Sequence, residues 1–384
     1  MSTEKTADMP DLQDCRRRID TIDDQIVRLF EERMKISEQV AAYKIRKGMK
    51  VRDPKREQEI IADRSAKAHG ELNVLGTAEI FRQIMAISRK KQYQLMSEQG
   101  IREENAFPFV EQLPVENRTV VFQGVEGAYS HAAMRGFFPP DIRSFHVKTW
   151  RDAMEEVVQK RADYAVLPIE NSTAGIVEDI YDLLMEYPLY IVGEQIIRVE
   201  HVLLGLPGAG LSDLKKIVSH PQGLAQCKKY LEAHPGWKKE EALNTAGAAR
   251  KVKENGDPTA AAIASREAGE VYSLEVLADH ICENTNNSTR FIIVSRKPVY
   301  RKDADQVSIC FELPHESGSL YNILSHIIYN GLNMTKIESR PVPGKAWEYR
   351  FFVDFEGNLN DSSVANALTG LEAEALKLRI LGNY

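Results

Sequence analysis

The 384-residue sequence contains few cysteines, and their positions exclude several kinds of site. Cys15, Cys227, Cys282 and Cys310 are scattered along the chain, so no two have the spacing of a zinc site or a redox motif. We therefore expect reduced thiols that pack as small apolar side chains, as is usual in the cytoplasm. The sequence predicts no metal site and no cofactor.

Long apolar runs are missing as well. No window approaches the roughly 18 apolar residues of a membrane-spanning helix, and the first eleven residues are too polar for a secretory signal. A net charge of −6 argues against nucleic acid or an anionic membrane as partners. The length and the 43% hydrophobic content predict a globular cytoplasmic protein of two or three domains.

In the first hundred residues, apolar side chains recur in steps of three and four, which is the period of a helix. The pattern predicts one helix over residues 11–47, ended by Gly48. A second begins at the N-cap Asp53, and a third covers residues 77–97. The first would be about 50 Å long at 1.5 Å per residue, too long to bury its stripe within one small domain. We therefore expect a helical bundle completed by a second copy of the chain.

A cation interrupts the apolar stripe of the first helix. Arg33 stands between Leu29 and Ile36, where the period requires an apolar residue, and an unpaired buried charge costs several kcal/mol. Either water reaches the apolar stripe at this point or an anion binds inside the bundle. Further polar residues of the three helices favour a pocket for a small dianion: Arg16, Lys44, Arg56, Ser88 and Gln92. A solvated basic surface accounts for Arg46, Lys47, Lys90 and Lys91.

Residues 11 to about 98 resemble the all-helical chorismate mutases, specifically the N-terminal domain of bifunctional chorismate mutase/prephenate dehydratases. The ligand-binding positions of that family fall, without departure, on Arg16, Arg33, Lys44, Asp53, Glu57, Ser88 and Gln92. The resemblance implies that Arg16 reaches into the site of a partner subunit. It also implies that Glu57 and the region of Asp53 bind the ring hydroxyl of chorismate.

The rearrangement of chorismate to prephenate is unimolecular and needs no nucleophile or general base. The two substrate carboxylates would be held by Arg16, Arg33 and Ser88. Lys44 and Gln92 would donate to the ether oxygen, which gathers negative charge as its bond breaks. One preorganised donor contributes about 3–4 kcal/mol, so two approach the ~8 kcal/mol at the low end of enzymatic acceleration.

After a linker predicted at residues 99–117, short strands repeatedly lead into a polar loop and a helix. These loops fall at residues 124–131, 169–175, 220–226 and 243–247. The N–H groups at a helix N-terminus suit a carboxylate or phosphate, but no loop matches a dinucleotide or Walker motif. The pattern predicts two α/β lobes with a small ligand between them.

A polar run at residues 284–288 leads through Thr289 and Arg290 into an apolar strand. Alone, a polar turn before a core strand would explain it. Together with residues 127–130, 168–171 and 219–222, however, Thr289-Arg290-Phe291 matches the motifs of prephenate dehydratases. Residues 118–296 resemble that family, which implies loss of water and carbon dioxide from prephenate to give phenylpyruvate.

The resemblance puts Thr289 at the essential position, where we interpret it as donor to, or orienter of, the leaving hydroxyl. Glu170 is the candidate acid, if the cleft raises its pKa by desolvation. For Glu170 and Asn171, the capped start of a helix remains an alternative explanation. The candidates for substrate binding are Asn171, Ser219, Gln226 and Arg290, with His220 a weaker one.

Residues 305–384 have the order strand, helix, strand, strand, helix, strand of a ferredoxin-like unit. They resemble the ACT amino-acid-binding domain, and the phenylalanine-linked motif appears as Glu338, Ser339, Arg340 and Pro341. The companion motif keeps Gly318 and Leu320 but departs at Ser319 and Tyr321. The resemblance implies a phenylalanine effector site, usually between two subunits, whose affinity the two departures leave open.

The sequence therefore predicts a multidomain protein with an all-α mutase bundle (11–98), a two-lobed α/β dehydratase domain (118–296) and an α+β ferredoxin-like ACT domain (305–384). Two alternatives are a non-catalytic protein that binds an aromatic acid, and a dehydratase whose helical domain only dimerises. Thr289 together with the mutase residues weighs against the first alternative, and the intact mutase set weighs against the second.

Overall fold

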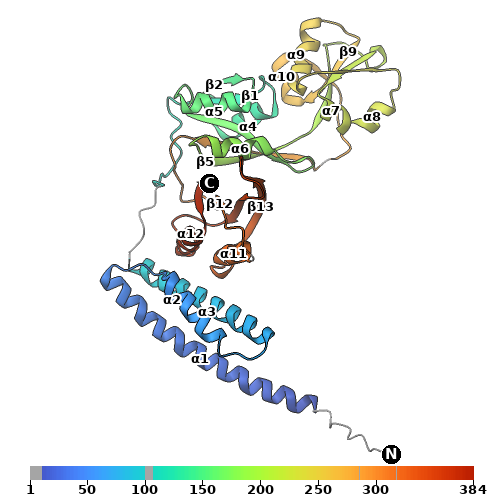
Figure 1. The fold of residues 1–384 in the computed structure, drawn as a ribbon. Coiled ribbons are helices and arrows are strands. Elements are labelled where there is room, and N and C mark those ends of the chain that lie inside the picture. The colour runs from blue at the N-terminus through green and yellow to red at the C-terminus, as the bar shows by residue number, and fades with distance from the viewer. Residues whose placement is uncertain (1–10, 100–106, 285, 317) are drawn as a thin grey trace, which may run out of the picture. The chain divides into compact units, whose positions relative to one another are not determined.

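The computed structural model describes residues 11–99, 107–284, 286–316 and 318–384 (Figure 1). Part of the predicted linker, residues 100–106, lies outside the described residues. So do the first ten residues and Thr285 of the polar run. The chain forms two compact units. The first holds the N-terminal helices and Cys310–Leu378, and the second holds the middle of the chain and Arg379–Tyr384.

Three helices form the N-terminal part of the first unit, and two have the predicted ends. Helix α1 spans Leu12–Lys47 between the N-cap Asp11 and Gly48, whose φ of 62° is left-handed. Helix α2, Pro54–Ser65, is capped by the side chain of Asp53. Helix α3 spans Glu71–Glu98 and so begins six residues before the predicted start. Gly76 lies inside it, because a glycine costs a helix only about 1 kcal/mol and does not end it.

The apolar stripe of α1 is exposed in the single chain. Its side chains retain between 40% and 65% of their accessible surface: Ile19, Ile22, Ile26, Leu29, Ile36, Val40 and Tyr43. The buried residues of α1 are only Ser37 and Ala41. Burying a large aliphatic side chain contributes about 1.5–3 kcal/mol, so one chain leaves much of this stabilisation unused.

The C-terminal elements have the predicted order. They are β12 (Gln306–Glu312), α11 (Ser319–Tyr329), β13 (Met334–Pro341), β14 (Tyr349–Glu356), α12 (Ser362–Glu374) and β15 (Lys377–Asn383). Their strands lie in the order β13-β14-β12-β15, which places the first and last strands of the motif next to each other. The ferredoxin-like order of elements is therefore present, with β13 at an edge.

The second unit contains two α/β lobes. In the first lobe, the strands lie in the order β5-β11-β3-β1-β2. Their bounds are Tyr190–Arg198 (β5), Ser288–Ser295 (β11), Tyr164–Asn171 (β3), Thr119–Gln123 (β1) and Arg143–Val147 (β2). Strand β11 is antiparallel to both neighbours, while β1 is parallel to β2 and β3. The accompanying elements are α4 (Tyr129–Phe137), α5 (Trp150–Val158), β4 (Gly175–Ile176) and α6 (Glu178–Glu186).

One local prediction for this lobe was wrong. Strand β3 continues through Glu170 and Asn171, and the next helix, α6, begins only at Glu178. These two residues therefore belong to a strand and do not cap a helix. The strand extends this far because β4 and β11 both pair with its end, at Glu170↔Ile176 and Thr289↔Asn171.

The second lobe is a five-stranded sheet in the order β10-β6-β9-β7-β8. Its strands are Glu275–Ala278 (β10), His201–Gly205 (β6), Ala260–Ser265 (β9), Lys216–Ser219 (β7) and Lys238–Glu241 (β8). The helices are α7 (Pro221–Gln226), α8 (Lys228–Glu232), α9 (Thr245–Asn255) and α10 (Arg266–Tyr272), with a short 3-10 turn, η1, at Leu211–Asp213. In the described residues, the chain passes between the lobes at residues 199–200, and it returns between the end of β10 and the start of β11 (Figure 1).

The two lobes meet closely at Gly127. Its φ is 80°, and a Cβ added there would lie 2.8 Å from the Cα of Ala268 on α10, so no other residue fits without a shift. Ser265 Oγ donates to the Gly127 carbonyl (3.0 Å), and Tyr272 Oη donates to the Glu126 carbonyl (2.8 Å). In the described residues, no helix is long and apolar enough to span a membrane.

Candidate functional site

The helical bundle brings together several of the predicted dianion-binding residues. Arg33 Nη1 donates to Ser88 Oγ at 2.8 Å, and Gln92 Nε2 donates to Ser37 Oγ at 3.2 Å. Ser88 and Gln92 are buried, and within the described chain Gln92 Oε1 has no hydrogen-bond partner. Rotating the Gln92 amide by 180° would keep a bond to the Ser37 hydroxyl and present an N–H at this buried position instead.

Lys44 lies beside the two acidic candidates of α2. Burial lowers the pKa of Lys44, and the carboxylates of Asp53 and Glu57 act on it in the opposite direction. Its ammonium donates to the Val51 carbonyl. Burial also lowers the pKa of Arg33. The site therefore holds two partly desolvated cations, which bind an anion more strongly than cations in water do.

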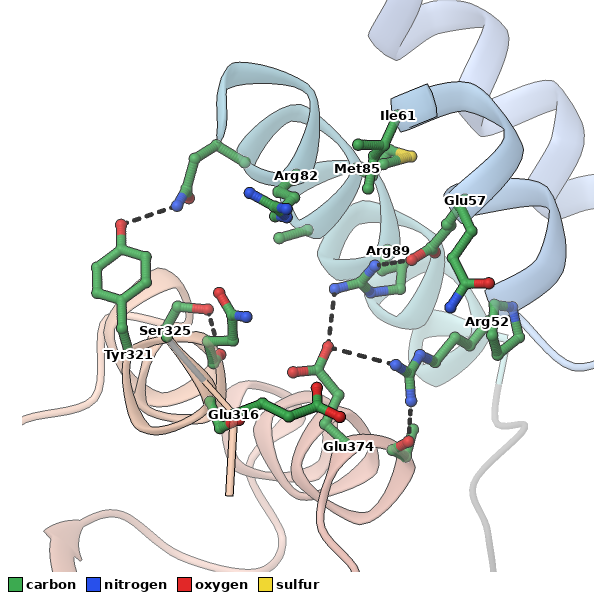
Figure 2. A pocket seen from close by; sticks show the side chains of 18 of the residues that line it. Arg52, Glu57, Ile61, Arg82, Met85, Arg89, Glu316, Tyr321, Ser325 and Glu374 are labelled. Atoms are coloured by element: carbon green, nitrogen blue, oxygen red, sulfur yellow. Dashed lines mark hydrogen bonds and ion pairs between the residues drawn. The ribbon is translucent and has the colours of Figure 1, made fainter. Parts of the chain in front are cut away.

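Arg89 belongs to the same region, although nothing in the sequence singled it out. Its Nη1 donates to Glu57 Oε2 at 2.6 Å, and its Nη2 lies 3.4 Å from Glu374 Oε1 on α12. Arg52 also reaches Glu374, at 3.8 Å. Figure 2 shows these side chains at one side of a cavity of about 880 Å³ that is lined by α2, α3, α11 and the end of α12.

Glu374 is shared by several cations of the first unit. Burial would raise its pKa, but His326, Arg89 and Arg52 together lower it. The pairing of a helical-bundle arginine with a carboxylate 285 residues later has no sequence signal, because it depends on how elements distant in the chain pack.

The structure does not bring Arg16 to the other mutase candidates of its own chain. Arg16 is exposed, and 17 residues of helix separate it from Arg33. At 1.5 Å per residue the separation is about 26 Å. A role for Arg16 at this site therefore requires a second chain.

In the α/β domain, Asn171 is the centre of a hydrogen-bonded cluster that contains Thr289. Its Nδ2 donates to Thr289 Oγ1 (2.9 Å), to Asn287 Oδ1 (2.8 Å) and to the Ser288 carbonyl (3.2 Å). Its Oδ1 accepts from the backbone N–H groups of Thr173 (3.0 Å) and Ala174 (2.9 Å). Asn287 is buried, whereas Asn171 and Thr289 are partly exposed, so the cluster reaches from the protein interior to the surface.

The two backbone donors fix the orientation of the Asn171 amide. A backbone N–H can only donate, so the atom that faces Thr173 and Ala174 is the oxygen. The amide nitrogen must then face Thr289, whose hydroxyl oxygen accepts its hydrogen bond. This leaves the Thr289 proton free to point away from Asn171, as a donor requires.

Arg290 lies on the other face of the sheet from Thr289, because successive strand residues alternate. Its Nε is 3.4 Å from Glu194 Oε2, and its Nη2 donates to Tyr384 Oη at 3.3 Å. Glu170 pairs with Arg290 across the strands, so it too is offset from the Thr289 face. The expected grouping of Arg290 and Glu170 with Thr289 is therefore absent from this geometry.

The remaining dehydratase candidates lie in the second lobe. Ser219 is fully buried, and its Oγ donates to the Ile263 carbonyl at 2.7 Å. His220 caps α7 by accepting from the N–H of Gln222. Gln226 Oε1 is 2.9 Å from Nε2 of His201. Ser219 and His220 thus have structural hydrogen bonds, whereas Gln226 belongs to a side-chain network.

His201 and Tyr129 complete that network and were not singled out by the sequence, although Tyr129 lies within a matched loop. His201 Nδ1 is 2.9 Å from Tyr129 Oη, which joins β6 of one lobe to α4 of the other. Burial lowers the pKa of His201 to about 4. Burial also raises the pKa of Tyr129 well above its usual value. Both side chains are therefore neutral at physiological pH.

Residues 282–289 connect the two dehydratase clusters. The backbone N–H of Glu283 donates to the Gln226 carbonyl at 3.0 Å, and Asn284 Nδ2 donates to Thr173 Oγ1 at 3.2 Å. This segment is one of the two crossings between lobes, and it ends at Thr289. The described residues of this segment therefore contact both clusters.

The predicted effector residues lie on two elements of the C-terminal fold. Gly318 is the N-cap of α11 with a φ of 84°, and Leu320 is half-buried in the first turn. Glu338 and Arg340 lie on one face of the edge strand β13, and Ser339 and Pro341 lie on the exposed face. In the described part of the chain, no group of three or more His, Cys, Asp or Glu residues could hold a metal ion.

Comparison with known proteins identifies both enzymatic regions. The family description "Chorismate mutase type II" matches residues 15–93, and "Prephenate dehydratase" matches residues 120–299. A bifunctional chorismate mutase/prephenate dehydratase of Aquifex aeolicus (strain VF5) is 32% identical over 378 residues, which are 98% of this chain and 98% of that protein.

Two solved structures resemble a large part of the chain. A prephenate dehydratase from Arthrobacter aurescens, determined in complex with L-Phe, has 34% identity and a TM-score of 0.63 and covers 69% of this chain and 89% of its own. A chain described as GqqA, a quorum-quenching acylase, has 37% identity and a TM-score of 0.64, and covers 70% and 97%.

The fold and its polar clusters define a multidomain enzyme, with one cluster in a helical bundle and others in a two-lobed α/β domain. The full-length likeness then gives the family. The chain belongs to the bifunctional chorismate mutase/prephenate dehydratases of phenylalanine biosynthesis, as the sequence predicted. The alternative of a non-catalytic binding protein is thereby excluded.

Proposed function

We propose that the helical bundle converts chorismate to prephenate, that the α/β domain converts prephenate to phenylpyruvate, and that phenylalanine inhibits through the C-terminal domain. The observation that carries the dehydratase assignment is the fixed amide of Asn171 beside Thr289. A cytoplasmic location and the absence of a cofactor stay predictions of the sequence.

For the mutase, Arg33 and Ser88 bind one substrate carboxylate, and Arg16 of a second chain contributes to binding the other. Lys44 and Gln92 donate to the ether oxygen, Lys44 through its ammonium and Gln92 through its rotated amide. Two opposite charges 4 Å apart attract by about 4 kcal/mol at an effective dielectric constant of 20, against about 1 kcal/mol in water. Partial burial of Lys44 therefore favours the transition state.

The acidic residues of α2 orient the substrate ring. Asp53 and Glu57 accept from the ring hydroxyl, and Arg89 holds the Glu57 carboxylate in place. Both carboxylates also attract the ammonium of Lys44, which keeps this cation at the site. The reaction itself then requires only positioning and electrostatic stabilisation.

The active mutase is a homodimer in which α1 helices of two chains cover each other's apolar stripes. Exposure of the stripe and the length of α1 both support this arrangement. Ile22→Glu, in the stripe, should therefore yield monomers without mutase activity. Leu243→Glu changes an equally apolar side chain that is 91% exposed elsewhere and serves as the control. Sedimentation of both variants tests the proposal, and a dimeric, active Ile22→Glu enzyme would contradict it.

In the dehydratase, the Thr289 hydroxyl donates to the ring hydroxyl of prephenate as its C–O bond breaks. The ring carboxylate leaves as carbon dioxide, and the electron pair of its C–C bond completes the aromatic ring. One proton is taken up to make water, and Thr289 passes it on from solvent, because Glu170 pairs with Arg290 and is offset from the Thr289 face. Asn171 positions Thr289. Gln226 is the candidate for substrate binding from the second lobe, with Ser219 and Arg290 as weaker ones.

A single time course tests both catalytic assignments. Given chorismate, the wild-type enzyme should form phenylpyruvate, whereas Thr289→Ala should consume chorismate at the normal rate and accumulate prephenate. Arg33→Leu should do the reverse, since it should process added prephenate but not chorismate. Loss of both activities in a folded Thr289→Ala enzyme would refute the assignment of two separate sites.

The inhibitory site for phenylalanine comprises the N-terminus of α11, with Gly318 and Leu320, and the end of β13, from Glu338 through Ser339 and Arg340 to Pro341. The N-terminus of α11 suits the ligand carboxylate, and the dehydratase of Arthrobacter aurescens was determined with L-Phe bound. An effector changes the affinity for substrate by a fixed coupling, typically 1–3 kcal/mol, and substrate changes effector affinity equally.

Calorimetric titration of phenylalanine into the Thr289→Ala enzyme tests this regulation, because prephenate persists there. As prephenate is increased, the affinity for phenylalanine should fall and then level off. If phenylalanine instead competed with prephenate for the catalytic site, its apparent affinity would keep falling as prephenate is increased. Gly318→Val should abolish the heat of binding, since its backbone has a left-handed φ that suits glycine.

A further inference from the structure

Two thiols that are 55 residues apart in sequence lie together in the second lobe. Cys227 Sγ and Cys282 Sγ are separated by 3.8 Å. Their backbones are held together independently, because the N–H of Glu283 donates to the Gln226 carbonyl at 3.0 Å and the N–H of Lys229 donates to Glu283 Oε1 at 3.0 Å. The pair is therefore a built feature of the fold, which the scattered spacing of the cysteines did not predict.

The environments of the two thiols differ. Cys227 is fully buried at the C-terminal end of α7, whereas Cys282 is partly exposed on the crossing segment between the lobes. Cys282 Sγ also accepts from the backbone N–H of His201 at 3.3 Å. The bond from Cys227 lowers the pKa of Cys282 to about 7, and that same bond and burial raise the pKa of Cys227. Cys282 is thus the accessible, ionisable thiol, and Cys227 is the buried thiol in contact with it.

We propose that Cys227 and Cys282 form a reversible intramolecular disulfide when the enzyme meets a low-molecular-weight disulfide, and that this bond slows the dehydratase. The Cys282 thiolate attacks one sulfur of the oxidant and releases its first thiol. Cys227 then attacks the Cys282 sulfur and releases the second. The two protein thiols together lose two electrons and two protons, and these reduce the oxidant to two thiols.

The new bond would act on both dehydratase clusters. It requires the two sulfurs to approach from 3.8 Å to about 2.05 Å. Gln226 precedes one cysteine in the chain, and the segment after the other leads to Asn287 and Thr289. A misplacement of about 1 Å in a catalytic site can lower the rate by about 10²-fold, so this closure is large enough to matter. The mutase residues lie in the other unit and would be unaffected.

The test uses the full-length enzyme, incubated with glutathione disulfide and then either kept oxidised or treated with dithiothreitol. Mass spectrometry of proteolytic fragments should find Cys227 joined to Cys282, with Cys15 and Cys310 still reduced. Dehydratase activity should fall by about 10- to 10²-fold and return on reduction, while mutase activity stays constant. Cys282→Ser should be insensitive to the oxidant, and Cys310→Ser, the matched control at another thiol, should respond like the wild type.

The outcomes separate this inference from the proposed function, on which its effect on activity rests. If only a glutathione adduct appears at Cys282, or no bond joins the two cysteines, the inference is wrong whatever the activity does. If the bond forms and the dehydratase rate is unchanged, its regulatory role is refuted. If the reduced enzyme has no dehydratase activity at all, the proposed function fails, and the fragment masses still decide whether the disulfide exists.

Discussion

Replacing Asn171 by aspartate exchanges the NH2 of the side-chain amide for a carboxylate oxygen and leaves the shape of the side chain almost unaltered. The acceptor that faces the N–H groups of Thr173 and Ala174 is retained. On the other side, a carboxylate oxygen now faces Thr289, the Ser288 carbonyl and the side chain of Asn287, all of which accept from the native amide. The Thr289 hydroxyl can then satisfy the carboxylate only by turning its proton inward.

Two costs follow from this reversal. The buried Asn287 oxygen loses the Asn171 donor but keeps Thr173 Oγ1 at 3.3 Å, so the lost hydrogen bond costs about 0.5–1.5 kcal/mol of stability. The substrate loses the Thr289 proton, and removing one such preorganised donor lowers the rate by about 10²–10³-fold, or about 3–4 kcal/mol. The loss of activity should therefore far exceed what partial unfolding explains.

The assay is phenylpyruvate formation from prephenate, with chorismate consumption in the same sample as an internal control for folding. Lowering the pH protonates the new carboxylate, which restores a donor to Thr289, so the variant-to-wild-type rate ratio should rise on acidification. Asn171→Ala removes the carboxylate as well and should show no such rise. A variant within about tenfold of the wild-type rate, or a ratio independent of pH, would refute the role given to Asn171.

Three further predictions concern other parts of the chain. Arg33→Leu should abolish mutase activity while the melting temperature is unchanged or higher, because an apolar replacement of a buried ion is often neutral or stabilising; sharp destabilisation would instead make Arg33 structural. Arg89→Met should cost about 1.5–3 kcal/mol by removing a hydrogen bond to a charged group and lower mutase activity, with Arg89→Lys partly restoring it; full activity in Arg89→Met would show that Glu57 needs no such support. Because His201 has a pKa of about 4 in the folded chain against 6.5 normally, the unfolded state binds an extra proton between these values. Stability should therefore fall as the pH drops through this window, by up to about 3 kcal/mol; urea unfolding of His201→Gln should lack this component, and an identical pH dependence would contradict it.

The sequence could predict elements whose signals are local. Gly48 and Asp53 act as caps because a left-handed glycine and a short-range hydrogen bond end or start a helix regardless of the remaining fold. The start of α3 was missed because a single glycine signals a boundary only weakly. The end of β3 was missed because Glu170 and Asn171 form a strand only through pairing with segments elsewhere in the chain.

The sites divide in the same way. Residues of a helical period, such as Ser88 and Gln92, could be assigned to one face from their spacing alone. The partners Arg89, His201 and Tyr129 could not, since each acquires its role from an element distant in sequence. A sequence motif also identifies residues without showing to which face of a strand their side chains point. Thr289 and Arg290 are adjacent in one motif, yet strand alternation turns them to opposite faces of β11.

That alternation gives the proposed regulation a physical basis. Thr289 faces the Asn171 cluster, while Arg290, the next residue, donates to the hydroxyl of Tyr384. The same hydroxyl lies 2.8 Å from Ser308 Oγ on β12, the first strand of the C-terminal fold. A shift of β12 or of the chain end therefore reaches the backbone that carries Thr289 through one side chain, without any contact between effector and substrate. A hydrogen bond of this kind contributes about 1.5–3 kcal/mol when it involves a charged group, which falls within the coupling of about 1–3 kcal/mol that inhibition at a distance requires.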